Sequence, residues 1–167
     1  LWNLLLINTH AGRGPQAIAY GERSLAIARE NELREQVAFT LHDLCNAYLY
    51  AGEIQQARAA LEESQQLWRE RGNLPMLADS LCNSSSFYVL SGEYDRALAL
   101  SAEAVRLSES IGNLWDQSYS YYYVGYVYFD RGEIDQAIKV METCRQLGDQ
   151  AGFMAATMQM HGELALD

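Results

Sequence analysis

An internal repeat of 40 residues leaves this chain few possible architectures. Gly12, Gly52, Gly92 and Gly132 are spaced 40 residues apart. The sequences around the last three glycines nearly coincide, as Ala51-Gly52-Glu53-Ile54-Gln55-Gln56-Ala57, Ser91-Gly92-Glu93-Tyr94-Asp95-Arg96-Ala97 and Arg131-Gly132-Glu133-Ile134-Asp135-Gln136-Ala137. Self-similarity at a fixed period of about 20–50 residues indicates stacked units, each of which buries its apolar face against a neighbour. The sequence therefore predicts a solenoid.

A second set of glycines divides each repeat into two helices. Gly72, Gly112 and Gly152 lie halfway through each repeat, 20 residues after Gly52, Gly92 and Gly132, and leave two segments of roughly 17 residues per repeat. Glycine suits the left-handed residue that ends a helix, and an acidic residue after the turn suits the positive end of the next helix. We expect three complete repeats over about residues 33–152, partial repeats at both ends, and one solenoid over residues 1–167.

Apolar and small residues recur at helical spacing inside each repeat. Ile54, Ala57, Leu61, Ser64 and Trp68 follow one another at three- and four-residue steps, as in an amphipathic helix. Small residues at equivalent positions let neighbouring helices approach closely. The residues predicted to pack the repeats are Ala57, Ala97, Ala137, Tyr48, Tyr88 and Tyr128, with Gly52, Gly92 and Gly132 in the turns.

One segment favours a strand when it is considered alone. Tyr119, Tyr121 and Tyr123 alternate within a run of strand formers. The repeat register makes this run equivalent to two earlier segments that are predicted as helices. Because propensity is a weaker guide than an internal repeat, we predict a helix here as well.

Composition argues against nucleic acid and membrane partners. The formal net charge is −10, the isoelectric point is about 4.7, and Lys139 is the only lysine, whereas phosphate binding needs clustered basic side chains. The longest apolar runs, such as residues 4–7, are far shorter than the roughly 20 residues that cross a bilayer. We predict neither direct nucleic-acid binding nor a membrane span.

Cys45, Cys82 and Cys144 are an odd number of cysteines at wide spacing. This usage is typical of reduced thiols in a cytosolic protein. We interpret all three as small core or groove residues.

Catalytic and metal motifs are missing from the sequence. His10, His42 and His161 fall in different repeats, and no zinc-protease, paired-cysteine, nucleophile-elbow or phosphate-loop motif occurs. His42, Cys82 and Asp79 could approach one another across neighbouring helices, but a polar groove pair explains them better than a metal site. We expect no enzymatic activity, cofactor or metal.

The repeat resembles the tetratricopeptide repeat, whose first helix has the pattern W-x2-L-G-x2-Y and whose second has A-x3-F. The best match is Tyr121-x2-Val124-Gly125-x2-Tyr128 followed by Ala137-x3-Met141. A second match is Leu41-x2-Leu44-Cys45-x2-Tyr48 followed by Ala57-x3-Leu61. Ser84, Ser85 and Ser101 depart from the pattern, so we expect looser packing in the middle repeat.

The period is longer than the common length of about 34 residues in this family. Such extended repeats resemble those of bacterial signal-transduction ATPases, transcription activators of the maltose-regulator type, and kinesin light chains. The resemblance implies an all-α fold, a right-handed superhelical solenoid of helix hairpins. It also implies that the first helices of successive repeats line a concave groove. The residues projected onto that groove are Phe39, His42, Asn46, Tyr50, Asp79, Cys82, Ser86, Tyr119, Tyr122, Tyr126 and Asp130.

The predicted groove is acidic and rich in tyrosine. The first helices carry Glu35, Asp43, Asp79, Asp116 and Asp130, and we count Arg131 at the rim as their only basic residue. Some relatives in the resembled family hold the carboxylate terminus of a partner with lysines. The positions that correspond to those lysines here hold His42 and Tyr50, so this mode of binding is disfavoured. Such a surface suits an extended cationic or apolar peptide, or a sugar. Alternatively, these tyrosines are helix-packing surface.

Both ends of the chain fall within a repeat. Residues 1–11 form the tail of a first helix, and residues 153–167 begin another. The apolar run near the N-terminus indicates a preceding repeat, a partner or self-association through uncapped ends. We predict a fragment of a larger cytosolic, bacterial regulator that binds a protein or peptide. The alternatives are a small-molecule sensor and a spacer or self-association module.

Overall fold

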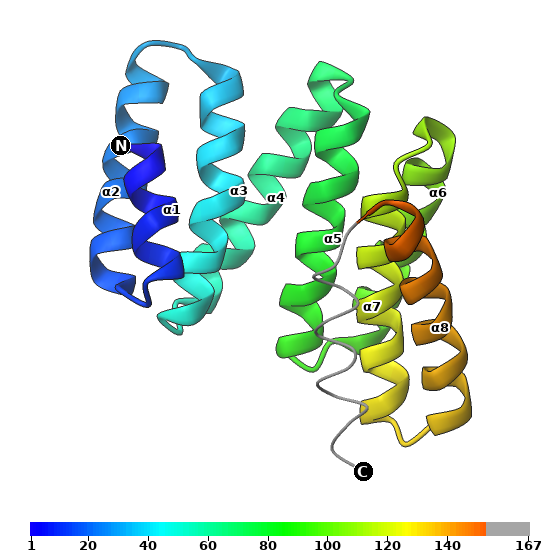
Figure 1. The fold of residues 1–167 in the computed structure, drawn as a ribbon. Helices are drawn as coiled ribbons and strands as arrows, with labels where there is room; N and C mark the ends of the chain where they lie inside the picture. The colour runs from blue at the N-terminus through cyan, green and yellow to red at the C-terminus, as the bar shows by residue number, and fades with distance from the viewer. Residues whose placement is uncertain (153–167) are drawn as a thin grey trace. The chain divides into compact units, whose positions relative to one another are not determined.

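The computed structural model describes residues 1–152, and all of the regular structure in that range is α-helical (Figure 1). The predicted all-α repeat architecture is confirmed. Most of the helices have 17 or 18 residues, in agreement with two helices per 40-residue repeat. The described helices are α1 (Trp2–His10), α2 (Gly14–Glu30), α3 (Arg34–Tyr50), α4 (Ile54–Arg71), α5 (Leu74–Leu90), α6 (Tyr94–Ile111), α7 (Leu114–Asp130) and α8 (Ile134–Gln150).

The segment with strand-like composition is helical. Tyr119, Tyr121 and Tyr123 all lie within α7, as the repeat register predicts. The helix expected from residue 153 onward lies outside the described residues.

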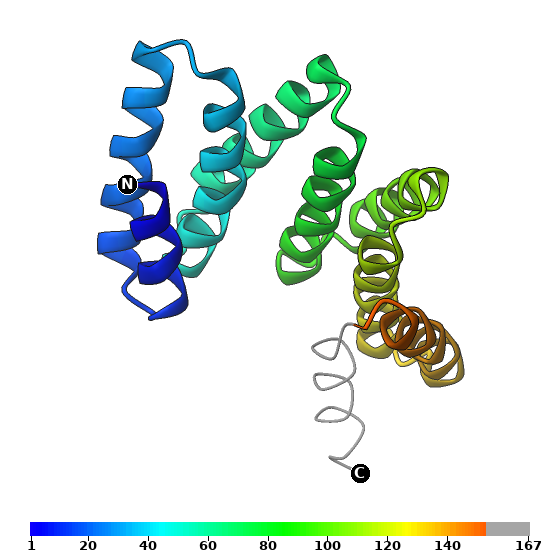
Figure 2. The same ribbon diagram turned by 45° about the horizontal axis from the view of Figure 1, so that its top comes forward.

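The chain forms two compact units. The first, Leu1–Asn73, contains α1 to α4, and the second, Leu74–Asp167, contains α5 to α8 and is described as far as residue 152. Within each unit consecutive helices are antiparallel neighbours. The α7 and α8 pair, for example, lies side by side in both views (Figures 1 and 2).

The turns use left-handed residues at the expected places. Gly52, Gly92 and Gly132 have φ angles of 78°, 73° and 74°, and Gly72 and Gly112 have 64° and 67°. A Cβ atom makes such angles costly, which is why glycine ends these helices. Glu32 is the exception, because it occupies the position equivalent to Gly72 with a φ of 55°.

Small side chains fill the spaces between helices. Ala57, Ala97 and Ala137 are 0%, 1% and 5% exposed. The serines that depart from the family pattern are also buried, and the hydroxyls of Ser84 and Ser85 donate to carbonyls one turn earlier in α5. The hydroxyls of Ser84 and Ser85 are therefore accommodated within the helix.

None of the helices in the described part of the chain has both the length and the apolar composition needed to cross a bilayer.

Candidate ligand-binding faces

Aromatic side chains of three helices form a row in the first unit. The Phe39 ring of α3 lies 5.8 Å from the Trp2 ring of α1 and 4.9 Å from the Trp68 ring of α4, measured between centroids. The Trp2 indole Nε1–H also donates to Oδ2 of Asp43 over 2.5 Å. Trp68 is fully buried, whereas Trp2 and Phe39 are half-buried. The row ties α1, α3 and α4 together and leaves part of two rings open to a ligand.

The other groove candidates of the first unit differ in exposure. His42 is only 7% exposed and Asn46 is half-buried, whereas Tyr50 is 73% exposed at the end of α3. His42 therefore offers little surface to a ligand, and Tyr50 offers a great deal.

In the second unit, four side chains of α7 form a strip that we call the aromatic face: Trp115, Tyr119, Tyr122 and Tyr126. Trp115 and Tyr119 stack with 5.0 Å between ring centroids and 10° between ring planes. The Tyr122 ring centroid lies 6.4 Å from the ring centroids of both Tyr119 and Tyr126. Residues three and four apart share one side of a helix, so the strip is continuous. All four side chains are half-buried, which leaves aromatic surface available for contact.

The aromatic face is supported by the helices on either side of it. The Tyr123 ring centroid lies 5.5 Å from that of Tyr119 and 5.3 Å from that of Tyr122. The Tyr123 hydroxyl is hydrogen-bonded to Ser86 of α5. Burial is the main reason that the pKa of Tyr123 lies well above its usual value. Tyr122 packs against the buried pair Met141 and Cys144 of α8. The rings are therefore held in position before any ligand binds.

The contact between α5 and α7, which we call the α5–α7 junction, is small and polar. The Cys82 Sγ lies 2.9 Å from the Ser120 Oγ and 3.5 Å from the main-chain oxygen of Asp116. Cys82 is 1% exposed, and burial raises the pKa of its thiol. Cys82, although projected onto the groove, therefore lies inside this junction as a neutral thiol.

Asp116 lies in the same junction and is also 1% exposed. It occupies the first turn of α7, where the Asn113 Nδ2–H donates to its Oδ2 over 2.6 Å. A helix N-terminus favours a negative charge by about 0.3–1 kcal/mol, whereas burying a carboxylate costs several kcal/mol. Burial therefore prevails and, with a further contribution from the charge of Asp79, raises the pKa of Asp116 to about 7. No cluster of side chains suited to a metal ion occurs within residues 1–152.

The count of basic residues on the first helices needs correction. Arg34 is the first residue of α3, so Arg131, which directly follows α7, is not the only one. Arg34 pairs with Glu70 of α4, and Arg71 of α4 pairs with Glu35. Because these charges balance, the acidic excess remains. It comes from Asp43, Asp79 and Asp130, because Asp116 is buried and its pKa is raised.

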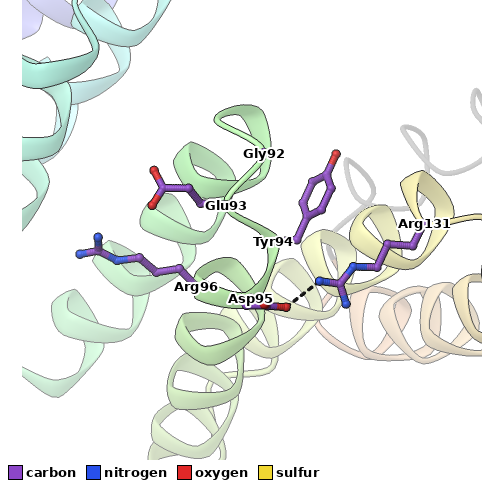
Figure 3. Close-up of a pocket in the computed structure, with 6 residues that line it drawn as sticks. All are labelled: Gly92, Glu93, Tyr94, Asp95, Arg96 and Arg131. Carbon is purple, nitrogen blue, oxygen red and sulfur yellow. Dashed lines mark hydrogen bonds and ion pairs between the residues drawn. The ribbon is translucent and has the colours of Figure 1, made fainter.

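An open hollow of about 330 Å³ lies beside the turn between α5 and α6, and Figure 3 shows the side chains that line it. Within it the Arg131 Nη2–H donates to Oδ1 of Asp95 over 2.6 Å, and nearby the Tyr94 hydroxyl donates to Oδ2 of Asp130 over 2.7 Å. Two arginines and two carboxylates balance inside the hollow, so it has no net charge with which to attract an ion. Its lining residues are Gly92, Glu93, Tyr94, Asp95, Arg96 and Arg131.

Two tryptophans were missed among the groove candidates. Trp2 lies 40 residues before His42, so the repeat spacing itself identifies its position. Trp115 lies one helical turn before Tyr119, and that spacing would have placed it on the same side of α7.

The tetratricopeptide repeat model matches residues 1–70 and again residues 36–110, which together make up more than half of the chain. The chain belongs to the tetratricopeptide repeat family. Repeats of this family generally mediate protein–protein interaction, and their solenoids are typically non-catalytic scaffolds. Among curated proteins no sequence matches the chain.

Solved structures support the fold. The tetratricopeptide chain is similar to BtubC (BKLC) from P. vanneervenii, with 20% identity and a TM-score of 0.76. That match covers 89% of this chain and 62% of BtubC. A putative kinesin light chain of P. anserina with TPR-like repeats matches with 19% identity and a TM-score of 0.73, covering 98% of this chain and 81% of that one. At these identities the likeness is one of fold alone.

Proposed function

We propose that this tetratricopeptide chain binds an extended peptide segment bearing arginine or lysine, and that the aromatic face of α7 is the centre of binding. The observation that carries the proposal is the continuous strip of four half-buried rings, held from below by contacts to α5 and α8. Pre-positioned aromatic rings provide a large contact area at little cost in conformational entropy.

The preference for a cationic ligand follows from the charges. Asp79 and Asp130 contribute negative charge to α5 and α7, and guanidinium and ammonium groups are attracted both to carboxylates and to aromatic ring faces. An acidic peptide would bring more negative charge to a surface that already has an excess.

We further propose that residues 1–167 form one continuous solenoid, with three full repeats over about residues 33–152, within a larger cytosolic and bacterial regulator. The extended period supports this proposal through its resemblance to the repeats of bacterial signalling ATPases and maltose-regulator-type activators. In such a regulator this chain is the interaction or sensor segment.

A charge-sorted peptide array tests the proposal. Wild type should bind cationic peptides best, with affinity that falls as salt is added. The double variant Tyr122→Ala, Tyr126→Ala should lose binding about tenfold or more, as expected for truncated aromatic anchors. Tyr20→Ala, on α2 in the other unit, is the matched control and should bind as wild type does.

Circular dichroism on each variant separates lost binding from lost folding, because Tyr122 also packs on Met141. Strongest binding to acidic peptides, or a folded double variant that binds as tightly as wild type, would contradict the assignment. Selective binding of a sugar would instead favour a small-molecule sensor.

Self-association is a second candidate, because apolar side chains of α1 and of the residue before it are exposed. Leu1, Leu4 and Ile7 are 40%, 39% and 55% exposed. We expect light scattering to show dimers or larger species at high concentration, and an Ile7→Glu substitution to reduce them. A strictly monomeric wild type would contradict this idea.

A further inference from the structure

The carboxyl group of Asp116 is poorly compensated for a buried acid. It is 1% exposed, and within residues 1–152 its hydrogen-bond donor is the neutral amide of Asn113 and no basic side chain pairs with it. Asp79 on the opposite helix of the α5–α7 junction adds a negative field. A buried carboxylate without a counter-charge is disfavoured relative to its protonated form.

We propose that the α5–α7 junction is a pH-sensitive element, closed while Asp116 carries a proton and weakened when Asp116 is ionised beside Asp79. Tyr123, whose hydroxyl reaches Ser86 of α5, lies in the same junction beneath the aromatic face. Loosening of the junction therefore also loosens the support of that face.

The direction of the pH effect follows from proton linkage. When the junction opens, Asp116 becomes hydrated and its pKa returns toward its usual value of 3.8, whereas in the closed junction burial raises it to about 7. Between these values the open state has lost the proton and the closed state still holds it. Each unit of rising pH in that window therefore favours opening about tenfold. Above about pH 7 both states are ionised, and the effect levels off.

Other titratable groups of the packed elements do not reproduce this arrangement. From α5, Asp79 and Cys82 face Asp116, and burial keeps the Cys82 thiol neutral. From α8, the Cys144 thiol faces Ser118 instead. The other charged residues of α6 and of the C-terminal half of α8 are absent from the groups that shift the pKa of Asp116; they are Asp95, Arg96, Glu103, Arg106, Glu109, Glu142, Arg145 and Asp149.

Amide hydrogen exchange of the full chain at pH 5, 6, 7 and 8, corrected for the intrinsic exchange rate, tests the inference. Protection of amides in α5 and α7 should fall about tenfold per unit between pH 5 and 7 and stay level at pH 8. Asp116→Asn keeps the size of the side chain and removes its charge, so the slope should disappear. Asp135→Asn, an exposed site on α8, is the matched control and should retain the slope.

Asp79→Asn gives an independent measurement if Asp116→Asn does not fold. Removing the charge of Asp79 lowers the pKa of Asp116, so protection should level off at a lower pH than in wild type. A wild-type protection that does not change with pH, a slope that persists in Asp116→Asn, or an unchanged profile in Asp79→Asn would overturn the inference. No peptide takes part, so the outcome is independent of the proposed binding function.

Discussion

Ala97→Leu tests whether the repeat register describes the packing of α6. Ala97 is 1% exposed, and its equivalents Ala57 and Ala137 are 0% and 5% exposed, so the position is enclosed wherever it occurs. Leucine adds three carbon atoms to a site with no room for them, and such overpacking typically costs about 1–3 kcal/mol. With a urea dependence of about 2 kcal/mol per molar, the midpoint should fall by about 0.5–1.5 M.

Ala99→Leu is the matched control, because Ala99 is exposed on the same helix. The two substitutions are chemically identical, and leucine and alanine differ little in helix propensity. Urea unfolding followed by circular dichroism should therefore shift for Ala97→Leu and hardly move for Ala99→Leu. Equal midpoints for the two variants would refute the assigned register.

Two further substitutions address individual positions. Glu32→Gly should stabilise the chain by about 0.5–1 kcal/mol, because relief of left-handed strain exceeds the entropy cost of glycine. Thermal unfolding measures the effect, with Glu32→Ala as the control. An equal Tm in the two variants would contradict the prediction. Ser101→Ala should stabilise by about 1 kcal/mol, because the buried Ser101 hydroxyl has no hydrogen-bond partner among residues 1–152. Ser108→Ala, whose hydroxyl donates to the Ala104 carbonyl oxygen, should not; urea midpoints in the reverse order would rule this out.

The helices and turns could be predicted because the same sequence pattern occurs in several successive repeats. A single glycine is weak evidence, but glycines at the same position in successive repeats identify turns that require a left-handed residue. The same repetition overruled the strand propensity of Tyr119, Tyr121 and Tyr123. Helix ends were less certain, since Arg34 lies at the boundary of α3 and assignments there vary by one or two residues.

Burial of polar groups could not be read from spacing. Asp116 and Asp79 are both acidic residues of first helices, yet one is 1% exposed and the other is half-buried. The difference arises because Asp116 lies one turn before Ser120 and points into the α5–α7 junction with it. Only the tertiary arrangement shows which of two such residues loses its water. Cys82 was placed on the groove and lies inside the junction for the same reason.

The second unit distributes its large and small side chains in an unusual way. Its α5–α7 junction buries serine, cysteine and aspartate side chains beside Tyr123, whereas four aromatic rings of α7 are only half-buried. Burying those rings in the junction would gain more hydrophobic stabilisation, at roughly 25 cal/mol per Å² of apolar surface. The sequence instead keeps the rings half-buried, where part of each ring stays available for contact. A junction that buries polar side chains is sensitive to the charge of one buried carboxylate. For this reason the protonation of Asp116 affects the support of the aromatic face, because both depend on the α5–α7 junction.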